Sequence, residues 1–333
     1  MTLRYDHSPQ AQRQQAEYIL AAINGELRSD DSRLYLLVDP LSLPDDSSDP
    51  LVNVLQALQP LAVKLPHDSL AADSYLWLLP LDLQDKQQAA LLTLSVDHAL
   101  QELHPQRLEQ GEGRAICGWL TSSFDATTVA RQLGETAIQR LPDNSSILLR
   151  YYDPAVHSIL WSSFNVLQRQ RWMGVLSSWI YPCADGQLII RRHKATPTPQ
   201  FTFSLMISHA DNALITQIGK INRALEQYRL QCLLLERYKE RRAIEIAKAA
   251  LQRACSLHQF SEEHDQQALA LDCLQWHPQL DMHPDIRILL SAEERPANSS
   301  YVKCVAQLND SLRQKMCDDM AVLAINTSCS PTY

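Results

Sequence analysis

Short apolar runs alternate with amphipathic segments through the N-terminal part of this 333-residue chain. Strand-like runs cover residues 34–38, 62–65, 75–79, 115–120 and 147–152, and helical patterns cover 51–58, 87–103 and 125–141. Two further runs, 175–181 and 188–192, flank Ala184-Asp185-Gly186, which predicts a β-hairpin. Because helices that alternate with strands must pack on the faces of a sheet, we expect an α/β lobe built on a mixed sheet.

The most specific part of this pattern is the segment 147–154, in which Ile147-Leu148-Leu149 leads into Arg150-Tyr151-Tyr152-Asp153-Pro154. An uninterrupted β-branched and aliphatic run favours a strand covered on both faces, so we interpret 147–152 as a buried strand. Asp153 is expected to accept hydrogen bonds from the first amides of the next helix, and Pro154 suits the first helical position because it has no amide proton.

Residues that cap or break helices and strands divide the chain into three predicted parts. Ser8-Pro9 and Asn24-Gly25 bracket a helical segment, so residues 1–30 are predicted to form an N-terminal helix. The α/β domain is predicted at 31–195, because the sequence Thr196-Pro197-Thr198-Pro199 that follows cannot continue a helix or a strand. Residues 200–333 are predicted to form a mostly α-helical lobe, with helices that include 261–274, 284–290 and 299–324.

A heptad-like seam marks the start of the helical lobe. Apolar residues recur in alternating steps of four and three at Leu214, Ile218, Ile221, Leu225, Tyr228, Cys232 and Leu235. This spacing predicts one helix that continues to about Ala254. Beyond Leu235 the segment becomes basic, and two interpretations remain open. In one interpretation, the segment is the solvent-exposed end of the long central helix of the lobe. In the other, it binds a partner through Tyr238, Arg241 and Arg242.

Composition argues against several classes of protein. A net charge of −8 with a pI near 5.8 disfavours a general nucleic-acid binder, which needs a basic surface. The eight cysteines include no Cys-x-x-Cys pair, and the spacing of His277, Asp281 and His283 fits no usual metal pattern, so we expect neither a metal nor a cofactor. The chain has no signal-like start and no apolar run of ~20 residues, which predicts a cytoplasmic protein without membrane insertion.

Catalytic motifs are also missing from the sequence. Gly111-Glu112-Gly113 lacks the third glycine of a dinucleotide fingerprint, and Gly118-Trp119-Leu120-Thr121-Ser122 is not a hydrolase elbow. Asp39 and Asp153 both follow predicted strands, so a small-molecule hydrolase or metal-assisted enzyme that uses them, with His157, is an alternative. Since Asp39, like Asp153, precedes a proline, helix capping is the simpler explanation, and we expect no catalytic site.

Several segments together resemble a known family. They are Tyr35-Leu36-Leu37-Val38-Asp39, Gly118 to Ser122, Arg150 to Pro154, and Gly174 to Trp179 after Gln168-Arg169-Gln170. In order and spacing they are similar to the type VI secretion effector adaptor-chaperone family, long catalogued as a domain of unknown function, over roughly residues 33–182. The chain departs from that family at Ala155 and Val175, where the family often has a basic residue and a proline.

The resemblance implies a binding role and no enzymatic activity. Such proteins bind a toxic effector protein in the cytoplasm, by its N-terminal or transmembrane-containing segment, stabilise it and help load it onto the VgrG spike protein. The segments that carry the resemblance contain, or in the case of Trp172 adjoin, these candidate residues: Asp39, Gly118, Trp119, Arg150, Tyr151, Tyr152, Asp153, Pro154, Trp172 and Gly174. Core packing explains most aromatic residues between Tyr151 and Tyr181, and any that lies exposed beside Arg150 would suit an interface anchor.

Overall fold

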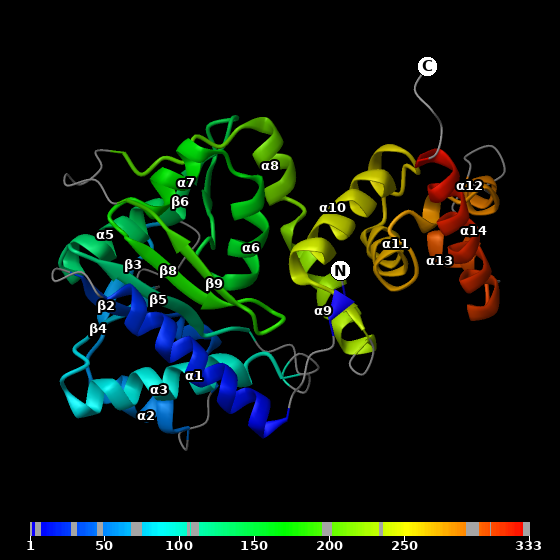
Figure 1. The fold of residues 1–333 in the computed structure, drawn as a ribbon. Coiled ribbons are helices and arrows are strands. Elements are labelled where there is room, and N and C mark those ends of the chain that lie inside the picture. The colour runs from blue at the N-terminus through cyan, green and yellow to red at the C-terminus, as the bar shows by residue number, and fades with distance from the viewer. Residues whose placement is uncertain are drawn as a thin grey trace. The chain divides into compact units, whose positions relative to one another are not determined.

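The computed structural model describes residues 2–3, 8–27, 32–44, 49–67, 75–104, 107, 113–194, 202–232, 236–290, 300–306 and 308–328, with side chains from 8 onward and up to 320. The chain forms two compact units (Figure 1). One is an α/β unit, Tyr5–Thr216, and the other is a helical unit, Gln217–Tyr333 with Met1–Arg4. The expected fold class is confirmed. The predicted boundary at 195–200 lies outside the described residues.

The α/β unit is built on a six-stranded sheet with the order β3-β4-β2-β5-β8-β9. The strands are β2 (Arg33–Val38), β3 (Leu61–Lys64), β4 (Tyr75–Leu81), β5 (Ile116–Ser122), β8 (Ser178–Pro182) and β9 (Leu188–Arg192). Every pair in this sheet is antiparallel, so the sheet is not mixed as expected. The β8–β9 hairpin is confirmed, and its two strands form one edge of the sheet.

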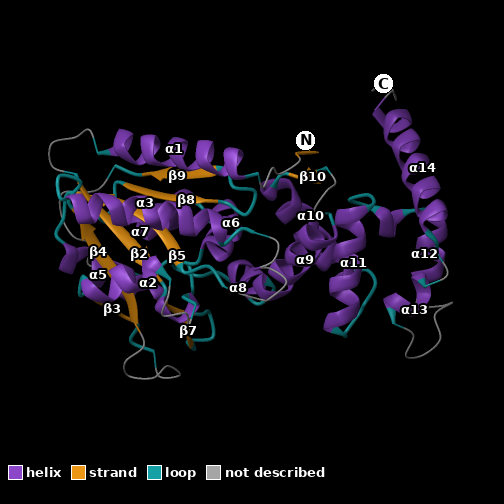
Figure 2. Cartoon of the chain, turned by 90° about the horizontal axis from the view of Figure 1, so that it is seen from below, coloured by secondary structure: helices purple, strands orange, loops and turns teal. Residues whose placement is uncertain are grey.

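Helices cover both faces of the sheet (Figures 1 and 2). One face carries α1 (Pro9–Glu26), α2 (Pro50–Ala57) and α3 (Lys86–Gln101), and the other carries α5 (Ala126–Ala137), α6 (Pro154–Ser163) and α7 (Val166–Met173). Side chains alternate between the two faces along each strand. On β2, Leu34 and Leu36 join the core under α1 and α3, while the Tyr35 hydroxyl donates to the Phe124 carbonyl just before α5. The α/β unit ends with α8 (His209–Ile215).

The segment 147–152 is not a strand of this sheet, and that prediction was wrong. Among the described strands, a short β7 (Ser146–Leu148) pairs with β6 (Ile138–Arg140) alone, and 149–152 form a turn. The reason is a tight turn at Asp143-Asn144, where Asn144 has a φ of 67° and Ser145 donates to the Asp143 carboxylate. The turn folds the chain back onto the residues after α5, so this helix stops at Ala137 instead of reaching 141.

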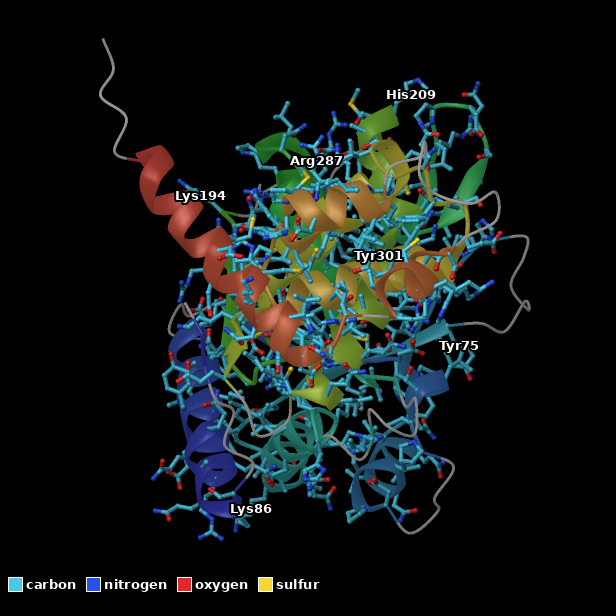
Figure 3. The ribbon with its side chains drawn as sticks, turned by 90° about the vertical axis from the view of Figure 1, so that its right-hand side faces the viewer. Tyr75, Lys86, Lys194, His209, Arg287 and Tyr301 are labelled. Atoms are coloured by element: carbon cyan, nitrogen blue, oxygen red, sulfur yellow. The ribbon has the colours of Figure 1, made fainter. Side chains whose placement is uncertain are left out.

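The helical unit contains α9 (Ile218–Gln231), α10 (Glu240–Ser256), α11 (Glu263–Gln275), α12 (Pro284–Leu290), α13 (Tyr301–Val305) and α14 (Asp310–Ser328). Tyr301 lies among these helices (Figure 3), where its hydroxyl donates to an Asp272 carboxylate oxygen at 2.7 Å. The Asn309 side chain accepts from the Leu312 amide, so a new helix starts there and the predicted helix 299–324 is two helices.

The single helix predicted from Leu214 to Ala254 is also wrong. The seam residues Ile218, Ile221, Leu225 and Tyr228 are buried on α9 as the spacing indicates, but α9 ends at Gln231. A short β10 (Arg237–Tyr238) then pairs with β1 (Thr2–Leu3), and the Tyr238 amide donates to the Tyr228 hydroxyl. This pairing with the N-terminus is non-local, so the heptad pattern does not reveal it.

Two glycines have different structural requirements. Gly118 lies at a bulge in the β2–β5 pairing with a φ of 140°, and a Cβ there would be 2.7 Å from the Ile180 carbonyl oxygen. Only glycine fits that position without strain. Gly25, by contrast, lies within the last turn of α1, which continues past it to Glu26, and a Cβ there would meet nothing within 4 Å.

We therefore expect Gly118→Ala to destabilise the α/β unit by roughly 3 kcal/mol, from the strained φ and the close contact. Gly25→Ala is the matched control and should stabilise the unit by about 0.5–1 kcal/mol, because alanine is the better helix former. Urea unfolding followed by tryptophan fluorescence reports mainly on this unit, which holds five of the six tryptophans. Equal midpoints for Gly118→Ala and the wild type would contradict the bulge requirement.

Candidate functional site

Asp39 and Asp153 cap the start of a helix, as expected, and so does Asp49, which also precedes a proline. Asp153 accepts a hydrogen bond from the Ala155 amide at 2.9 Å at the start of α6. Asp49 accepts from two amides at the start of α2, and Asp39 accepts from the Leu41 amide ahead of a 3₁₀ turn. In each case the proline takes the first helical position, where no amide proton is required.

Two of these caps converge on Arg150. Its Nη2 atom lies 3.1 Å from Asp39 Oδ2 and 3.7 Å from Asp153 Oδ2. The Asp39 side chain is 6% exposed and that of Arg150 is 49% exposed, so the pair spans the boundary between the core and solvent. We call Asp39, Arg150 and Asp153 the charged corner. Sequence reasoning named all three residues, and the structure brings them together.

Burial decides the protonation behaviour of Asp39 and of two groups near it. It raises the pKa of Asp39, although Arg150 and the Leu41 amide act in the opposite direction. Burial also raises the pKa of the Cys117 thiol and of the Tyr152 hydroxyl, and the Asp39 charge adds to both shifts. At neutral pH both groups therefore keep their protons, so neither is an activated nucleophile or a base.

The carboxylate oxygens of the charged corner already have partners. Asp39 uses one oxygen for the Leu41 amide and the other for Arg150, while Asp153 uses one for the Ala155 amide. A general base needs a free oxygen within reach of a substrate proton. The described cavities of about 1060 and 360 Å³ in this unit are lined by other residues. This arrangement favours a structural corner over acid-base chemistry.

His157, the third residue of the enzyme alternative, lies one turn into α6 and away from these carboxylates. Its ring packs 4.6 Å from Trp172, 5.0 Å from Trp179 and 5.6 Å from Trp161, measured between ring centroids. Burial, with the charge of Arg191, lowers the pKa of His157 well below its usual value. The imidazole is therefore neutral and part of the core.

Most aromatic side chains near the charged corner are also core residues, and the Tyr151 hydroxyl donates to the Leu133 carbonyl. The buried aromatics are Tyr151, Tyr152, Phe164, Trp172, Trp179 and Tyr181. Trp161 is the half-buried member of the group. Trp119, on β5, is fully buried and donates its indole proton to the Ser95 hydroxyl. The candidates Trp119, Tyr151, Tyr152 and Trp172 thus stabilise the fold from within.

Two other candidates shape the backbone. Pro154 is buried at the first position of α6. Gly174 ends α7 with a φ of 51°, and a Cβ there would collide with the Gln132 side chain. Neither residue offers a side chain to a ligand, so both belong with the scaffold.

The remaining candidates lie in the helical unit. Tyr238 is in β10, and Arg241 and Arg242 are in the first turn of α10. The Arg241 side chain is 89% exposed and pairs with Glu245 at 3.6 Å, and Arg242 reaches the same carboxylate at 3.5 Å. These two arginines are therefore accessible cations whose ion pairs lie on the surface and contribute little to stability.

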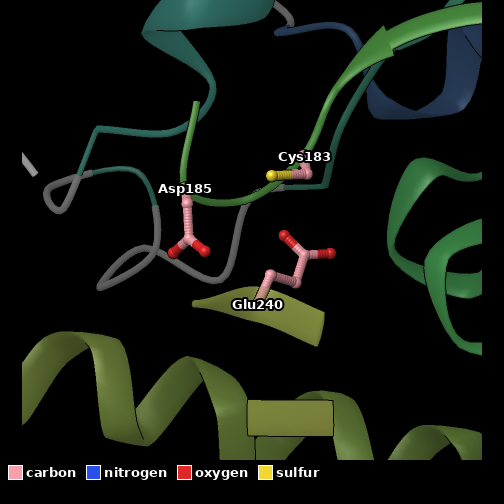
Figure 4. A group of neighbouring side chains, drawn as sticks. All are labelled: Cys183, Asp185 and Glu240. Carbon is pink, nitrogen blue, oxygen red and sulfur yellow. The ribbon is translucent and has the colours of Figure 1, made fainter. Parts of the chain in front are cut away.

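Both units contain cysteine or carboxylate side chains of the kinds that bind metal ions. In the α/β unit, Cys183 and Asp185 both come from the turn between β8 and β9 (Figure 4). Two ligands from one turn fall short of the three or four that a protein metal site uses. In the helical unit, Glu240 opens α10.

The buried Asp281 is held by two side chains that sequence reasoning missed. Arg253 donates to both Asp281 oxygens at 2.7 Å, and the His258 ring lies 3.0 Å away. Burial alone would raise the pKa of Asp281, but the hydrogen bonds from His258 and Arg253 lower it to about 2. The segment between α11 and α12, which contains His277, is thus held to α10 by an ion pair. No local signal identifies it, because its partners are distant in sequence.

The comparisons with known proteins identify one region. Residues 34–171 match the sequence model of a family described as a domain of unknown function (DUF4123). The chain matches no curated protein and no solved structure. Among the described helices, none combines the length and the apolar character that crossing a bilayer requires.

The charged corner predicts a double-mutant result. Arg150→Met leaves the Asp39 carboxylate buried without its cation, which should destabilise the α/β unit by about 1–2 kcal/mol at pH 7, since Arg150 is half exposed. Asp39→Asn keeps a capping oxygen and removes the charge, so alone it should change stability by less than about 1 kcal/mol. Combined with Arg150→Met, it should recover most of the loss, as measured by urea unfolding.

The contribution of Asp39 to folding stability depends on pH in a direction that its pKa shift determines. Because the pKa of Asp39 is raised in the folded protein, its contribution favours folding below its unfolded value and is lost as pH rises through the folded value. Removing Arg150 enlarges this shift. The loss of unfolding free energy caused by Arg150→Met should therefore shrink as the pH falls toward about 4. A loss of unfolding free energy that is the same at every pH, or that is absent at pH 7, would count against the ion pair.

The Asp281 network makes a separate prediction for the helical unit. Asp281→Asn should destabilise it by roughly 3 kcal/mol, because the Arg253 charge loses its partner. Asp285→Asn, on an exposed side chain, is the control and should change stability by less than about 0.5 kcal/mol. The lowered pKa of Asp281 stabilises the wild type above about pH 4, and this is lost as pH falls toward 2. Thermal unfolding monitored by circular dichroism measures both effects.

Proposed function

We propose that this protein is an adaptor or chaperone that binds a toxic effector protein of a type VI secretion machine, stabilises it and helps load it onto the VgrG spike. The observation that carries the proposal is the resemblance of the segments around Tyr35–Asp39, Gly118–Ser122 and Arg150–Pro154, which all fall within the matched region 34–171. They also belong to one folded unit, in which Asp39 and Arg150 are paired.

The chemistry of the charged corner supports a binding role over an enzymatic one. The oxygens of Asp39 are taken by an amide and a guanidinium, and Asp153 caps α6. His157 is neutral and buried among tryptophans. These groups keep a scaffold in shape, and no observation specifically favours the hydrolase alternative.

The helical unit is the proposed site of effector specificity, because the family resemblance and the matched region both end before it. Its exposed basic turn at Arg241 and Arg242 offers charge that does not hold the fold together. An effector segment that is apolar or destined for a membrane would aggregate in water, and binding by a chaperone would cover that surface. We propose that the bound segment is such an N-terminal or transmembrane-containing segment.

The test is a tagged pull-down from the bacterium of origin after crosslinking, with mass spectrometry of near-stoichiometric partners. We expect the wild type to recover one large toxin-like protein, with or without a spike component. Arg241→Glu with Arg242→Glu should lower that recovery by at least about fivefold, because charge reversal opposes the partner. Arg287→Glu with Lys303→Glu, two exposed cations elsewhere in the unit, is the matched control and should not. Recovery of the protein alone would overturn the proposal.

A further inference from the structure

Strand β9 leaves part of its backbone without partners. It is the last strand of the sheet, and among the described strands it pairs with β8 alone. The Cys183 amide donates to the Gln187 carbonyl and the His193 amide to the Ser177 carbonyl, both at 2.8 Å. In an antiparallel ladder the bonded residues alternate, so positions 187, 189, 191 and 193 face β8. The N–H and C=O groups of Leu188, Ile190 and Arg192 therefore point outward, and no described backbone group bonds to them.

One face of this edge is covered by α1, which runs alongside β9 (Figure 2). The Gln15 amide donates to the Gly186 carbonyl at 2.6 Å, and Glu26 binds the Arg192 guanidinium at the other end. Leu188 and Ile190 pack toward the core beneath this helix. These contacts engage side chains and the preceding turn. Among the described residues, nothing in these contacts occupies the outward backbone groups of β9, where another strand could bond.

The opposite face carries an unusual concentration of positive charge. The Arg191 guanidinium lies 4.9 Å and that of Arg169 lies 5.6 Å from the ring centroid of the half-buried Trp161. The Nε atoms of both arginines are buried without a hydrogen-bond partner among the described residues. No described carboxylate forms an ion pair with either guanidinium. Two cations therefore share one indole, and their mutual repulsion is not offset by a neighbouring acid.

We propose that the β9 edge and the Trp161, Arg169 and Arg191 side chains form one docking surface for an extended, acidic segment of the protein's partner. The segment adds a strand to the sheet by bonding to the outward groups of Leu188, Ile190 and Arg192. Its alternate side chains then project onto the Trp161 face. An aspartate or glutamate at such a position pairs with the two guanidinium groups.

Charge is what selects this occupant. An exposed sheet edge alone accepts many strands, and proteins normally protect such edges by covering or charging them. Here the uncompensated arginines disfavour a basic or neutral strand and favour an acidic one, because carboxylate–guanidinium pairs are strong and directional. The inference rests on the proposed binding function and adds to it a second contact, made by an acidic segment of the same partner at the sheet edge.

The experiment begins with a phage-displayed library of random dodecapeptides selected against the full-length protein. We expect the enriched peptides to carry acidic residues at alternating positions. A synthetic peptide with the enriched sequence is then measured by fluorescence anisotropy. Ile190→Pro removes one outward N–H without touching the β8 ladder, and it should weaken binding at least about fivefold. Ile190→Thr keeps that N–H and serves as its matched control, with binding close to that of the wild type.

Charge is tested by a second pair of variants. Arg169→Glu should weaken the same peptide at least about tenfold, since it replaces one of the two cations by a repelling acid. Arg131→Glu, on the exposed surface of α5, is the control and should leave binding unchanged. If Ile190→Pro is unstable, amide exchange in the wild type provides an independent readout. The peptide should slow exchange at Leu188, Ile190 and Arg192.

Three outcomes would overturn the proposal. One is an enriched peptide that binds Ile190→Pro and Arg169→Glu as tightly as wild type. Another is unchanged exchange of the three outward amides, and the third is a dimer of the protein that Ile190→Pro converts to monomers. Failure of the adaptor function is distinguishable. If wild type and Ile190→Pro capture the effector equally well, the docking surface at the β9 edge is refuted and the adaptor function stands. If acidic peptides bind at the edge but no effector is captured from cells, the adaptor function is refuted and the docking surface stands.

Discussion

The carboxylate of Asp39 connects parts of the α/β unit that are far apart in the sequence. Asp39 follows the central strand β2, and the Asp39 backbone amide donates to the Ala115 carbonyl, just ahead of β5. Its side chain caps the 3₁₀ turn and also binds Arg150. Arg150 in turn begins the tight turn that places Tyr151 under α5 and Asp153 at the start of α6. The position of α6 relative to the sheet thus depends on one buried acid.

This pair specifies geometry more than it supplies stability. Burial raises the pKa of Asp39 even with Arg150 nearby, so the ionised carboxylate is partly compensated and not strongly favoured. Apolar replacements of such pairs are often as stable as the pair itself. What an apolar pair lacks is direction: the guanidinium fixes the distances among three segments. A scaffold that presents surfaces to a partner needs that kind of fixed geometry.

Sequence reasoning succeeded where the determining contacts are local. The Asp-Pro caps at Asp39, Asp49 and Asp153 depend on amides within three residues, so the motif is sufficient to predict them. The six strands of the main sheet were located for the same reason, because each one coincides with an apolar run in the sequence. It failed at 147–152, where the turn at Asp143-Asn144 captures the apolar run in a separate hairpin.

Non-local contacts account for the other failures. The heptad seam predicted a continuous helix, but pairing of β10 with the N-terminal β1 interrupts it, and no periodicity can report a partner so distant in sequence. The spacing of residues in the sequence likewise does not predict that Arg253 and His258 bind Asp281. Among the site candidates of the α/β unit, the charged residues formed the corner, whereas Trp119, Tyr151 and Trp172 are core residues. Residue type alone does not separate an interface aromatic from a core aromatic.

In the proposed function, a short sheet edge and a basic helical turn make complementary contributions to binding. Three outward residues of β9 offer few main-chain bonds, so a strand docked there alone would exchange quickly. Arg241 and Arg242 contribute surface charge, which accelerates encounter more than it prolongs the complex. When one partner engages both surfaces, the second contact becomes intramolecular, and its effective concentration multiplies the affinity of the first. Two individually weak surfaces on one chain would therefore suit the proposed adaptor, which must hold its cargo firmly and still release it.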